Sequence, residues 1–326
     1  MIIAWLLVAV FVLILVAVLC WASGGQTVYA TSGSGIIEAI PDAIEATPTP
    51  PSGRLVILSF SLAYGLGTRS HDRTAPSASA ICDRLDYMIE TIVASGADVA
   101  LLQEADFASQ RTYEIDEFYY IVAALGWGYA ARAVTWECRY YPWPLTQPIG
   151  RLRAGIGVIS RYPLIQNVRH HLPPARTWSV LTPRFRPRQT VQMVDVQCGG
   201  MSVRLFNATI ARRHTLPDSR QVRALASFVR DAYTPTCVLM GALNPSLGET
   251  AELESSLLMT ELGSHFQAVT QHDRAASGST GHSAVHQAFV GRDLRPLDVQ
   301  WLTMDAPIVE HDPLALHLRW ALAMAL

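Results

Sequence analysis

The sequence contains no lysine, so each of its 25 basic residues is an arginine. Charged residues make up 16% of the 326-residue chain, and the formal net charge at pH 7 is −2. The chain therefore has no overall positive field that would attract nucleic acid, although a local basic patch is compatible with this charge. Arginine suits bidentate phosphate contacts, but so many arginines cannot all be ligands.

Cysteine is also scarce. The five cysteines form no Cys-x-x-Cys pair, which argues against a zinc site. They are Cys20, Cys82, Cys138, Cys198 and Cys237. The last four could form disulfides if the domain is exported; buried single thiols are the alternative that we favour.

No charged side chain precedes Glu38, and the run from Ile2 to Ala22 is almost entirely apolar. At ~1.5 Å per residue this run can span ~30 Å of hydrocarbon, and Trp5 and Trp21 lie near its ends, where interfacial aromatics are favoured. We therefore predict that residues 1–24 form a single transmembrane anchor, with the C-terminal part outside the cytoplasm. A signal peptide cleaved after Val28-Tyr29-Ala30 and a buried soluble helix are the alternatives.

A linker is expected over residues 25–53. Its second half is rich in proline and in small polar residues, a composition that favours extended, solvated chain. The turn-forming residues are Pro41, Pro48, Pro50, Pro51 and Gly53. We predict a stalk here and a globular domain over residues 54–326.

The globular part alternates strand-like and helical patterns, which indicates a layered α/β domain. Helical spacing covers residues 81–94, 115–125 and 219–232. Strand-like runs cover residues 55–62, 99–102, 156–159, 191–196, 203–210, 237–240, 298–303 and 315–320. Residues 271–296, which include His272, His282 and His286, are polar and are expected to form a solvated loop.

Four polar residues lie at the ends of predicted strands, where sites are commonly built. Glu104 ends one strand, Asn244 follows another, Asp298 begins a third, and His311 precedes a fourth. Each has an ordinary structural reading as well: a capping carboxylate, a turn former, an ion-pair partner and a surface histidine. Only their order and spacing together point to a site.

Six segments, taken in their order along the sequence, resemble motifs of the endonuclease/exonuclease/phosphatase superfamily. They are Ala97–Glu104, Gly155–Leu164, Asn207–Thr209 with the following Arg220-Gln221, Gly241–Pro245, Leu297–Val299 and Glu310–Pro313. The resemblance covers roughly residues 54–322. It implies a four-layer α/β sandwich of two mixed β-sheets flanked by helices, here preceded by the transmembrane helix, and a lineage of Mg²⁺-dependent phosphoester hydrolases.

The resemblance assigns roles to the residues that match. Glu104 corresponds to the metal-binding glutamate, and Glu310 stands beside the final histidine as a second metal ligand. Asn244 matches the asparagine that contacts phosphate or water. Asp298 and His311 match the pair in which a carboxylate orients the catalytic histidine.

Three positions depart from the motifs. Ser61 stands in place of an asparagine, Thr209 in place of a histidine, and Ala242 in place of the aspartate that positions the attacking water. Loss of a general base costs roughly 10²–10⁴-fold in rate, and loss of a transition-state donor costs another ~10²-fold. These departures predict a weak or inactive enzyme.

Three functions are compatible with the sequence. The first is a membrane-anchored, catalytically impaired protein that binds a phosphate-containing ligand or a protein. The second is an active Mg²⁺-dependent phosphodiesterase or phosphatase with a rearranged site, acting on nucleic acid, nucleotides or phospholipid headgroups. The third is a structural envelope scaffold.

Two further clusters have a plain reading. The aromatic residues between Trp136 and Pro144 are expected to pack over the core rather than to form a substrate platform. The arginines at positions 184, 186 and 188 are expected to lie on a solvated face, with contact to phosphate as the alternative.

Overall fold

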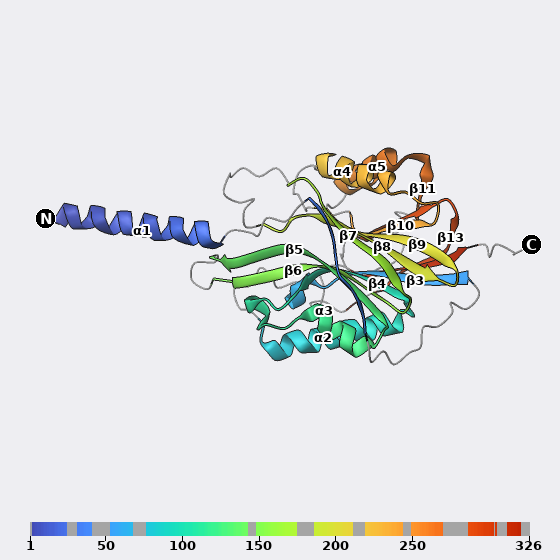
Figure 1. Cartoon of the computed structure of the whole chain (residues 1–326), viewed down its shortest axis with the longest axis horizontal. Coiled ribbons are helices and arrows are strands. Elements are labelled where there is room, and N and C mark those ends of the chain that lie inside the picture. Colours follow the sequence, from blue (N-terminus) through green and yellow to red (C-terminus); the bar gives the residue numbers. More distant parts are fainter. Residues whose placement is uncertain are drawn as a thin grey trace, which may run out of the picture.

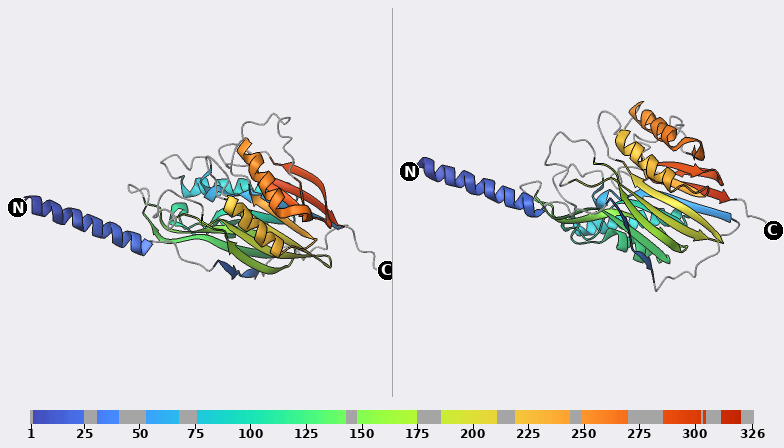
Figure 2. Two further views of the ribbon diagram at one scale, coloured as in Figure 1. Left: turned by 90° about the horizontal axis from the view of Figure 1, so that it is seen from above. Right: turned by 45° about the horizontal axis from the view of Figure 1, so that its top comes forward.

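The computed structural model describes residues 2–24, 31–40, 53–67, 76–142, 148–174, 186–210, 219–243, 249–269, 286–302, 304 and 312–320. Two mixed β-sheets of seven strands each pack face to face, with helices on both outer faces (Figures 1 and 2). This arrangement confirms the predicted α/β sandwich of two sheets flanked by helices.

Sheet A contains the first strands of the globular part at its centre. In spatial order its strands are β13 (Leu294–Trp301), β14 (Leu314–Trp320), β3 (Arg54–Ser61), β4 (Val99–Asp106), β6 (Gly150–Ser160), β5 (Tyr129–Tyr141) and β2 (Ile37–Ala39). Only β3 and β4 pair in parallel among these neighbours.

Sheet B is built mainly from the second half of the chain. In spatial order its strands are β1 (Ser32–Ser34), β7 (Leu164–His171), β8 (Thr190–Cys198), β9 (Met201–Thr209), β10 (Cys237–Ala242), β12 (His286–Gly291) and β11 (Phe266–Ala268). Strands β9 and β10 form its parallel pair.

The alternation of side chains along β3 explains the layering. Leu55 and Ile57 point to the apolar core between the sheets, whereas Leu58 and Phe60 pack with the helices outside sheet A. Successive residues of a strand face opposite sides, so Ser59 and Ser61 continue the inner row. This inner row therefore changes from apolar to polar toward the carboxyl end of β3.

The helices cover the outer faces. Helices α2 (Ala78–Ala94) and α3 (Glu117–Leu125) lie on sheet A, and α4 (Ser219–Asp231) and α5 (Glu249–Leu262) lie on sheet B (Figure 1). Short 3₁₀ turns occur at η2 (Ala63–Gly65), η4 (Gln110–Thr112) and η6 (Gly263–His265). Side chains at the N-caps fix the starts of α2 and α3, because Ser77 and Asp116 accept hydrogen bonds from backbone amides in the first turns.

Residues 31–40, which we expected to belong to the linker, are part of the sandwich. They form an N-terminal arm in which β1 pairs with β7 at the edge of sheet B and β2 pairs with β5 at the edge of sheet A. At the crossover the Gly35 amide donates to the Asn167 carbonyl at 2.8 Å, and Asn167 Nδ2 donates to the Ile36 carbonyl at 3.0 Å. The arm therefore joins the two sheets, while most of the Pro-rich stretch lies outside the described residues.

Helix α1 (Ile2–Gly24) projects away from the sandwich (Figures 1 and 2). Its described side chains, Ile3 and residues 5–18, are exposed. Within the described residues, neither α1 nor any other helix provides a segment long and apolar enough to cross a membrane. The membrane anchor stays a prediction.

The expected loop over residues 271–296 differs from the structure at its end. Residues 286–291 form β12, which is buried throughout, and Leu294 already begins β13. Strand β12 belongs to sheet B because it pairs with β10 along five residues. The thiols Cys138, Cys198 and Cys237 are free and buried, and Cys82 is free and half-buried, as we favoured.

Candidate functional site

The carboxyl ends of β3 and β4 bring Ser61 and Glu104 together. In the parallel pairing Ser61 lies opposite Gln103, and the Ser61 hydroxyl donates a hydrogen bond to Glu104 Oε2 at 3.0 Å. Ser61 is buried and Glu104 is half-buried. A partly buried carboxylate is costly unless it is hydrogen-bonded or paired, and the Ser61 hydroxyl supplies one such bond.

The facing edge of sheet B carries Thr209, Ala242 and His286 side by side. The register pairs Ala242 with Thr209 of β9 on one side and with His286 of β12 on the other. Paired residues share a face of the sheet, so a methyl group lies between a hydroxyl and an imidazole. The preceding Gly241 has a φ of +148°, and a Cβ there would lie 2.0 Å from the Ala208 carbonyl oxygen, so only glycine fits at this close approach.

A buried polar network ties the two edges together. Gln103 Nε2 donates to Asn207 Oδ1 at 2.8 Å and to Ser59 Oγ at 3.2 Å. Asn207 Nδ2 donates in turn to the Leu102 carbonyl of sheet A at 3.1 Å. On the other side, Ser59 Oγ and His286 Nδ1 lie 2.9 Å apart. All four side chains of this network, Ser59, Gln103, Asn207 and His286, are fully buried. They hold Ser61, Glu104 and Thr209 at one end of the inter-sheet core.

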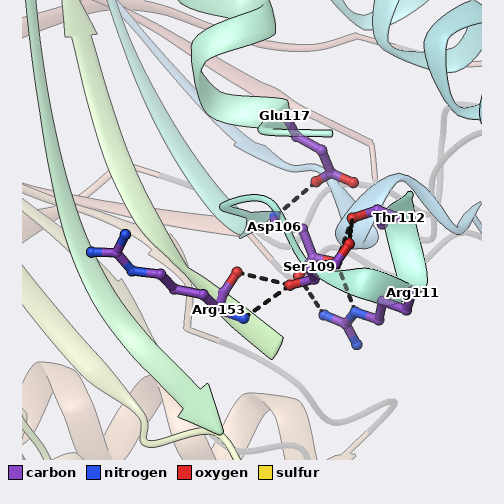
Figure 3. Close-up of polar contacts among 6 residues, drawn as sticks. All are labelled: Asp106, Ser109, Arg111, Thr112, Glu117 and Arg153. Atoms are coloured by element: carbon purple, nitrogen blue, oxygen red, sulfur yellow. Dashed lines mark hydrogen bonds and ion pairs between the residues drawn. The ribbon is translucent and has the colours of Figure 1, made fainter. Parts of the chain in front are cut away.

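A second polar cluster supports the segment after β4 (Figure 3). Arg111 forms a bidentate ion pair with the buried Asp106, at 2.7 and 2.8 Å. The Asp106 amide donates to Glu117 Oε2 at 2.9 Å. Ser109 exchanges hydrogen bonds with the backbone of Arg153 on β6, at 2.9 and 3.0 Å. The segment that follows Glu104 is thus fixed to both α3 and β6.

Aromatic side chains enclose the Arg111 guanidinium beside this cluster. It lies 4.1 Å from the centre of the Tyr64 ring and 5.1 Å from that of Trp136, as expected of cation–π contacts. Burial, followed by the negative charge of Glu104, raises the pKa of Tyr64. Burial alone would lower the pKa of Arg111, but the Asp106 charge raises it. Trp136 is almost completely buried, as predicted, whereas Tyr140 of the same aromatic run is exposed and Tyr141 is half-buried.

The backbone is strained in this part of the molecule. Six described non-glycine residues have a positive φ, and each lies after β3, in the last part of β4 or after β4. They are Ala63, Tyr64, Glu104, Ala108, Tyr113 and Glu114. Non-glycine residues seldom adopt such angles, and they cluster at functional sites when surrounding contacts hold them there. Glu104 itself has a φ of +53° at the point where the pairing of β4 with β6 shifts register.

Comparison with solved structures identifies the architecture. A protein described as endonuclease/exonuclease/phosphatase from Beutenbergia cavernae aligns over 82% of this chain and 72% of its own, with 13% identity and a TM-score of 0.60. The human Nocturnin catalytic domain with bound sulfate anion aligns over 88% and 97%, with 13% identity and a TM-score of 0.56. The chain has the endonuclease/exonuclease/phosphatase fold.

A third structure with this fold is D. rerio TDP2 complexed with single strand DNA product. It aligns over 82% of this chain and 99% of its own, with 12% identity and a TM-score of 0.51. No family model matches the chain, and no curated protein sequence matches it. At these identities the likeness establishes the endonuclease/exonuclease/phosphatase fold alone.

The described donors supply only part of the coordination of the Mg²⁺ that the motif resemblance predicts. Mg²⁺ requires near-octahedral oxygen coordination, usually with one or two carboxylates. Glu104 supplies one carboxylate, which already accepts the Ser61 hydrogen bond, and Glu310 lies outside the described residues. Among the described residues no three histidine, cysteine or acidic side chains converge as metal ligands.

The structure brings together four of the predicted residues: Ser61, Glu104, Thr209 and Ala242. Asn244, Glu310 and His311 lie outside the described residues. Asp298 does not join the cluster. It is exposed on the edge strand β13, opposite His317, and hydrogen bonds from the Gln300 side chain and from its neighbour's backbone amide lower the pKa of its carboxyl.

His286 is the residue that the sequence analysis missed. We assigned it to a solvated loop, yet it is fully buried, lies opposite Ala242 and contacts Ser59. The signal for it was the short apolar run Ala288–Gly291 that follows it, which is the rest of strand β12. In the described part of this edge, the residue that pairs with Ala242 on β12 is therefore an imidazole rather than an acidic side chain.

Proposed function

We propose that this chain binds phosphate esters at the carboxyl edge of its two sheets and hydrolyses them weakly or not at all. The register of Thr209, Ala242 and His286 is the observation that carries this proposal. A methyl group at the centre of the edge can neither accept a proton from water nor orient it. A positioned general base contributes about 10²–10⁴-fold to such reactions, so its loss removes most of the expected rate.

Binding is the part of the activity that the remaining side chains support. The hydroxyl of Thr209 and the imidazole of His286 are hydrogen-bonding groups on the inner face of this edge, whereas the Ser61 hydroxyl is already donated to Glu104. Groups of this kind suit phosphate oxygens. Nocturnin, which shares the fold, carries a sulfate anion, and TDP2 is complexed with single strand DNA product; a tetrahedral oxyanion is the chemistry common to both.

An active hydrolase is the second candidate, and the position of His286 favours it. An imidazole directly across from Ala242 is a proton acceptor close to the place of the missing carboxylate. Histidine is the side chain most often used as a general base. In this reading Ser59, whose hydroxyl lies 2.9 Å from His286 Nδ1, orients the ring.

One assay separates the two candidates. The purified full-length chain in detergent is incubated with bis(p-nitrophenyl) phosphate and Mg²⁺ or Mn²⁺, beside Glu104→Gln, Ala242→Asp and His286→Gln. We expect wild type to release nitrophenol at the background rate and Ala242→Asp to exceed it at least tenfold. Turnover by wild type that disappears in both Glu104→Gln and His286→Gln would instead establish an active hydrolase that uses His286.

Binding is measured separately, because a protein that does not hydrolyse phosphate esters can still bind them. Fructose 6-phosphate is titrated against wild type and Thr209→Val, a nearly isosteric change that removes one hydroxyl donor. We expect a saturable rise in melting temperature that is smaller in Thr209→Val. The absence of any saturable shift in wild type would refute phosphate binding at this edge.

We further propose that α1 anchors the domain in a membrane, with the domain on the extracytoplasmic side. The proposal rests on the uncharged sequence before Glu38 and on the exposure of the described apolar side chains of α1. Strand β5 runs in the same direction as β3 and β4. In Figure 1 its carboxyl end lies on the side of the sandwich nearest α1. Resistance of the full-length protein to carbonate extraction, lost on Leu13→Arg, tests the anchor.

A further inference from the structure

The carboxyl edge of sheet B continues beyond Thr209 onto two more strands. Strand β8 pairs antiparallel with β9, so that Val191 lies opposite Ala208 and the start of β8 reaches the level of Thr209. Strand β7 pairs antiparallel with β8, and its last residue, His171, lies opposite Thr190. The ends of β7, β8, β9 and β10 therefore form one row along the same edge.

Two basic side chains of β7 face the interior of the sandwich at this edge. Asn167 Nδ2 donates to the Arg132 carbonyl of sheet A at 3.3 Å, so Asn167 points between the sheets. Strand alternation then places Arg169 and His171 on the same inner face. His170 points outward instead, where its ring stacks on Phe228 of α4 with the ring centres 4.5 Å apart.

Arg188 joins them from the segment before β8. Its backbone amide donates to the Thr135 carbonyl of β5 at 3.1 Å, which places this residue between the edges of the two sheets. The Thr190 hydroxyl donates to the Arg188 carbonyl at 2.9 Å and lies 2.8 Å from His171 Nδ1. Arg188 is half-buried, and its guanidinium has no hydrogen bond or ion pair within the described part of the chain.

The charges of these groups act on one another. Burial, and then the positive charges of Arg169 and Arg188, lower the pKa of His171 to about 4. Burial and the Arg188 charge also lower the pKa of Arg169. A partly buried guanidinium is costly unless an anion offsets it, and Arg188 has no anionic partner within the described part of the chain. Of the arginine cluster that we expected on a solvated face, Arg186 is exposed and Arg188 is half-buried, and Arg184 lies outside the described residues.

We propose that Arg169, Arg188 and His171 form a subsite for a second phosphate group of the ligand. Neighbouring strands lie about 4.8 Å apart, so β7 is about 10 Å from Thr209 along the edge. The guanidinium forks of two arginines match the oxygens of a phosphate group. The inference rests on the proposed function and narrows its ligand to compounds that carry two phosphates at opposite ends of a sugar-sized body.

Fructose 1,6-bisphosphate and fructose 6-phosphate provide the test, because they differ by the second phosphate. Each is titrated calorimetrically against the full-length protein in detergent, with wild type, Arg188→Gln and the control Arg295→Gln, an exposed arginine on β13. We expect wild type and Arg295→Gln to bind the bisphosphate at least tenfold more tightly than the monophosphate. Arg188→Gln is expected to bind both compounds with the monophosphate affinity.

The possible failures are distinct. If wild type binds neither compound, the proposed function is refuted and the subsite with it. If wild type binds both equally, or if Arg188→Gln weakens both equally, the edge binds phosphate but the subsite does not exist. Arg169→Gln repeats the measurement from the neighbouring strand, and a preference for the bisphosphate that survives both substitutions also overturns the proposal.

A parallel titration with a lipid identifies the source of the second phosphate. Short-chain phosphatidylinositol 4-phosphate carries two phosphates on one headgroup and is titrated under the same conditions. Tighter binding than the hexose bisphosphate, with the same dependence on Arg188, supports the subsite and assigns it to a lipid headgroup. Weaker binding that still depends on Arg188 supports a subsite for a soluble bisphosphate. Binding of either compound that does not depend on Arg188 counts against the subsite.

Discussion

The Ser61 hydroxyl donates a 3.0 Å hydrogen bond to Glu104 Oε2 across the parallel pair β3 and β4. This contact joins a residue that departs from the superfamily motifs to one that matches them. Ser61 therefore has a structural partner in this chain, and the bond orients the Glu104 carboxylate at the carboxyl end of β4.

Removal of this bond is expected to destabilise the protein. Ser61→Ala leaves the half-buried Glu104 carboxylate without one donor, and a hydrogen bond to a charged group contributes about 1.5–3 kcal/mol. We expect a loss of about 1–2 kcal/mol in the free energy of unfolding, measured by urea denaturation of the full-length chain. Ser202→Ala, an exposed serine on β9, is the matched control. Equal stabilities for the two variants would show that the bond contributes nothing.

Disruption of the buried polar network between the sheets is expected to reduce stability more than loss of the Ser61–Glu104 hydrogen bond. Asn207 accepts from Gln103 and donates to the carbonyls of Leu102 and Gly157 in sheet A. Asn207→Leu has a similar volume but removes three buried hydrogen bonds, while Gln103 Nε2 keeps the Ser59 hydroxyl as an acceptor; a buried polar group that loses its partner costs about 1–3 kcal/mol. We expect at least about 3 kcal/mol of destabilisation in urea denaturation. Gln267→Leu, at an exposed position of β11, should change stability by less than about 0.5 kcal/mol.

The N-terminal arm offers a comparison between two glycines. A Cβ at Gly35 would lie 2.2 Å from Asn167 Nδ2, whereas a Cβ at Gly33 would meet only the flexible end of Arg169, at 3.3 Å. Gly35→Ala is therefore expected to cost about 1–3 kcal/mol through overpacking and to release the arm for cleavage by thermolysin. Gly33→Ala should stay close to wild type in both measurements. Proteolysis at the same rate in both variants would mean that the crossover does not hold the arm.

Much of the fold could be predicted because its central elements carry clear periodicity. The spacing of Ile81, Leu85, Met88 and Ile92 predicts the buried face of α2, and all four are buried. The apolar runs of β3 and β4 predict strands buried on both faces, and their carboxyl ends bring Ser61 and Glu104 into contact. These are local patterns that tertiary packing reinforces rather than overrides.

The parts that could not be predicted depend on pairing between distant segments. Strand β12 is six residues long and follows a polar stretch, so its length alone does not separate it from a loop. The short sequence Leu297-Asp298-Val299 matched the expected motif and led to Asp298, although His286 is the residue that pairs with Ala242. Strands β1 and β2 have three residues each and exist because exposed edges of β7 and β5 are available to pair with them.

The buried Glu117 predicts a pH dependence of stability. Burial, and then the negative charge of Asp106, raise the pKa of the Glu117 carboxyl well above its ordinary value. Its Oε1 has no hydrogen-bond partner within the described residues. The folded chain therefore keeps a proton that the unfolded chain releases above about pH 4.3. Between that pH and the raised pKa, stability falls as pH rises, by at most about 1.4 kcal/mol per pH unit.

The substitution Glu117→Gln removes this titration while its carbonyl oxygen can still accept from the Asp106 amide. We expect the variant to match wild type near pH 4 and to become more stable than wild type as pH rises toward 8. Urea denaturation of both proteins at pH 4, 6 and 8 measures the difference, with Glu90→Gln, an exposed residue of α2, as the control. Parallel pH profiles for Glu117→Gln and wild type would mean that Glu117 is ionised in the folded protein, in which case the Arg111 guanidinium rather than a retained proton offsets its charge.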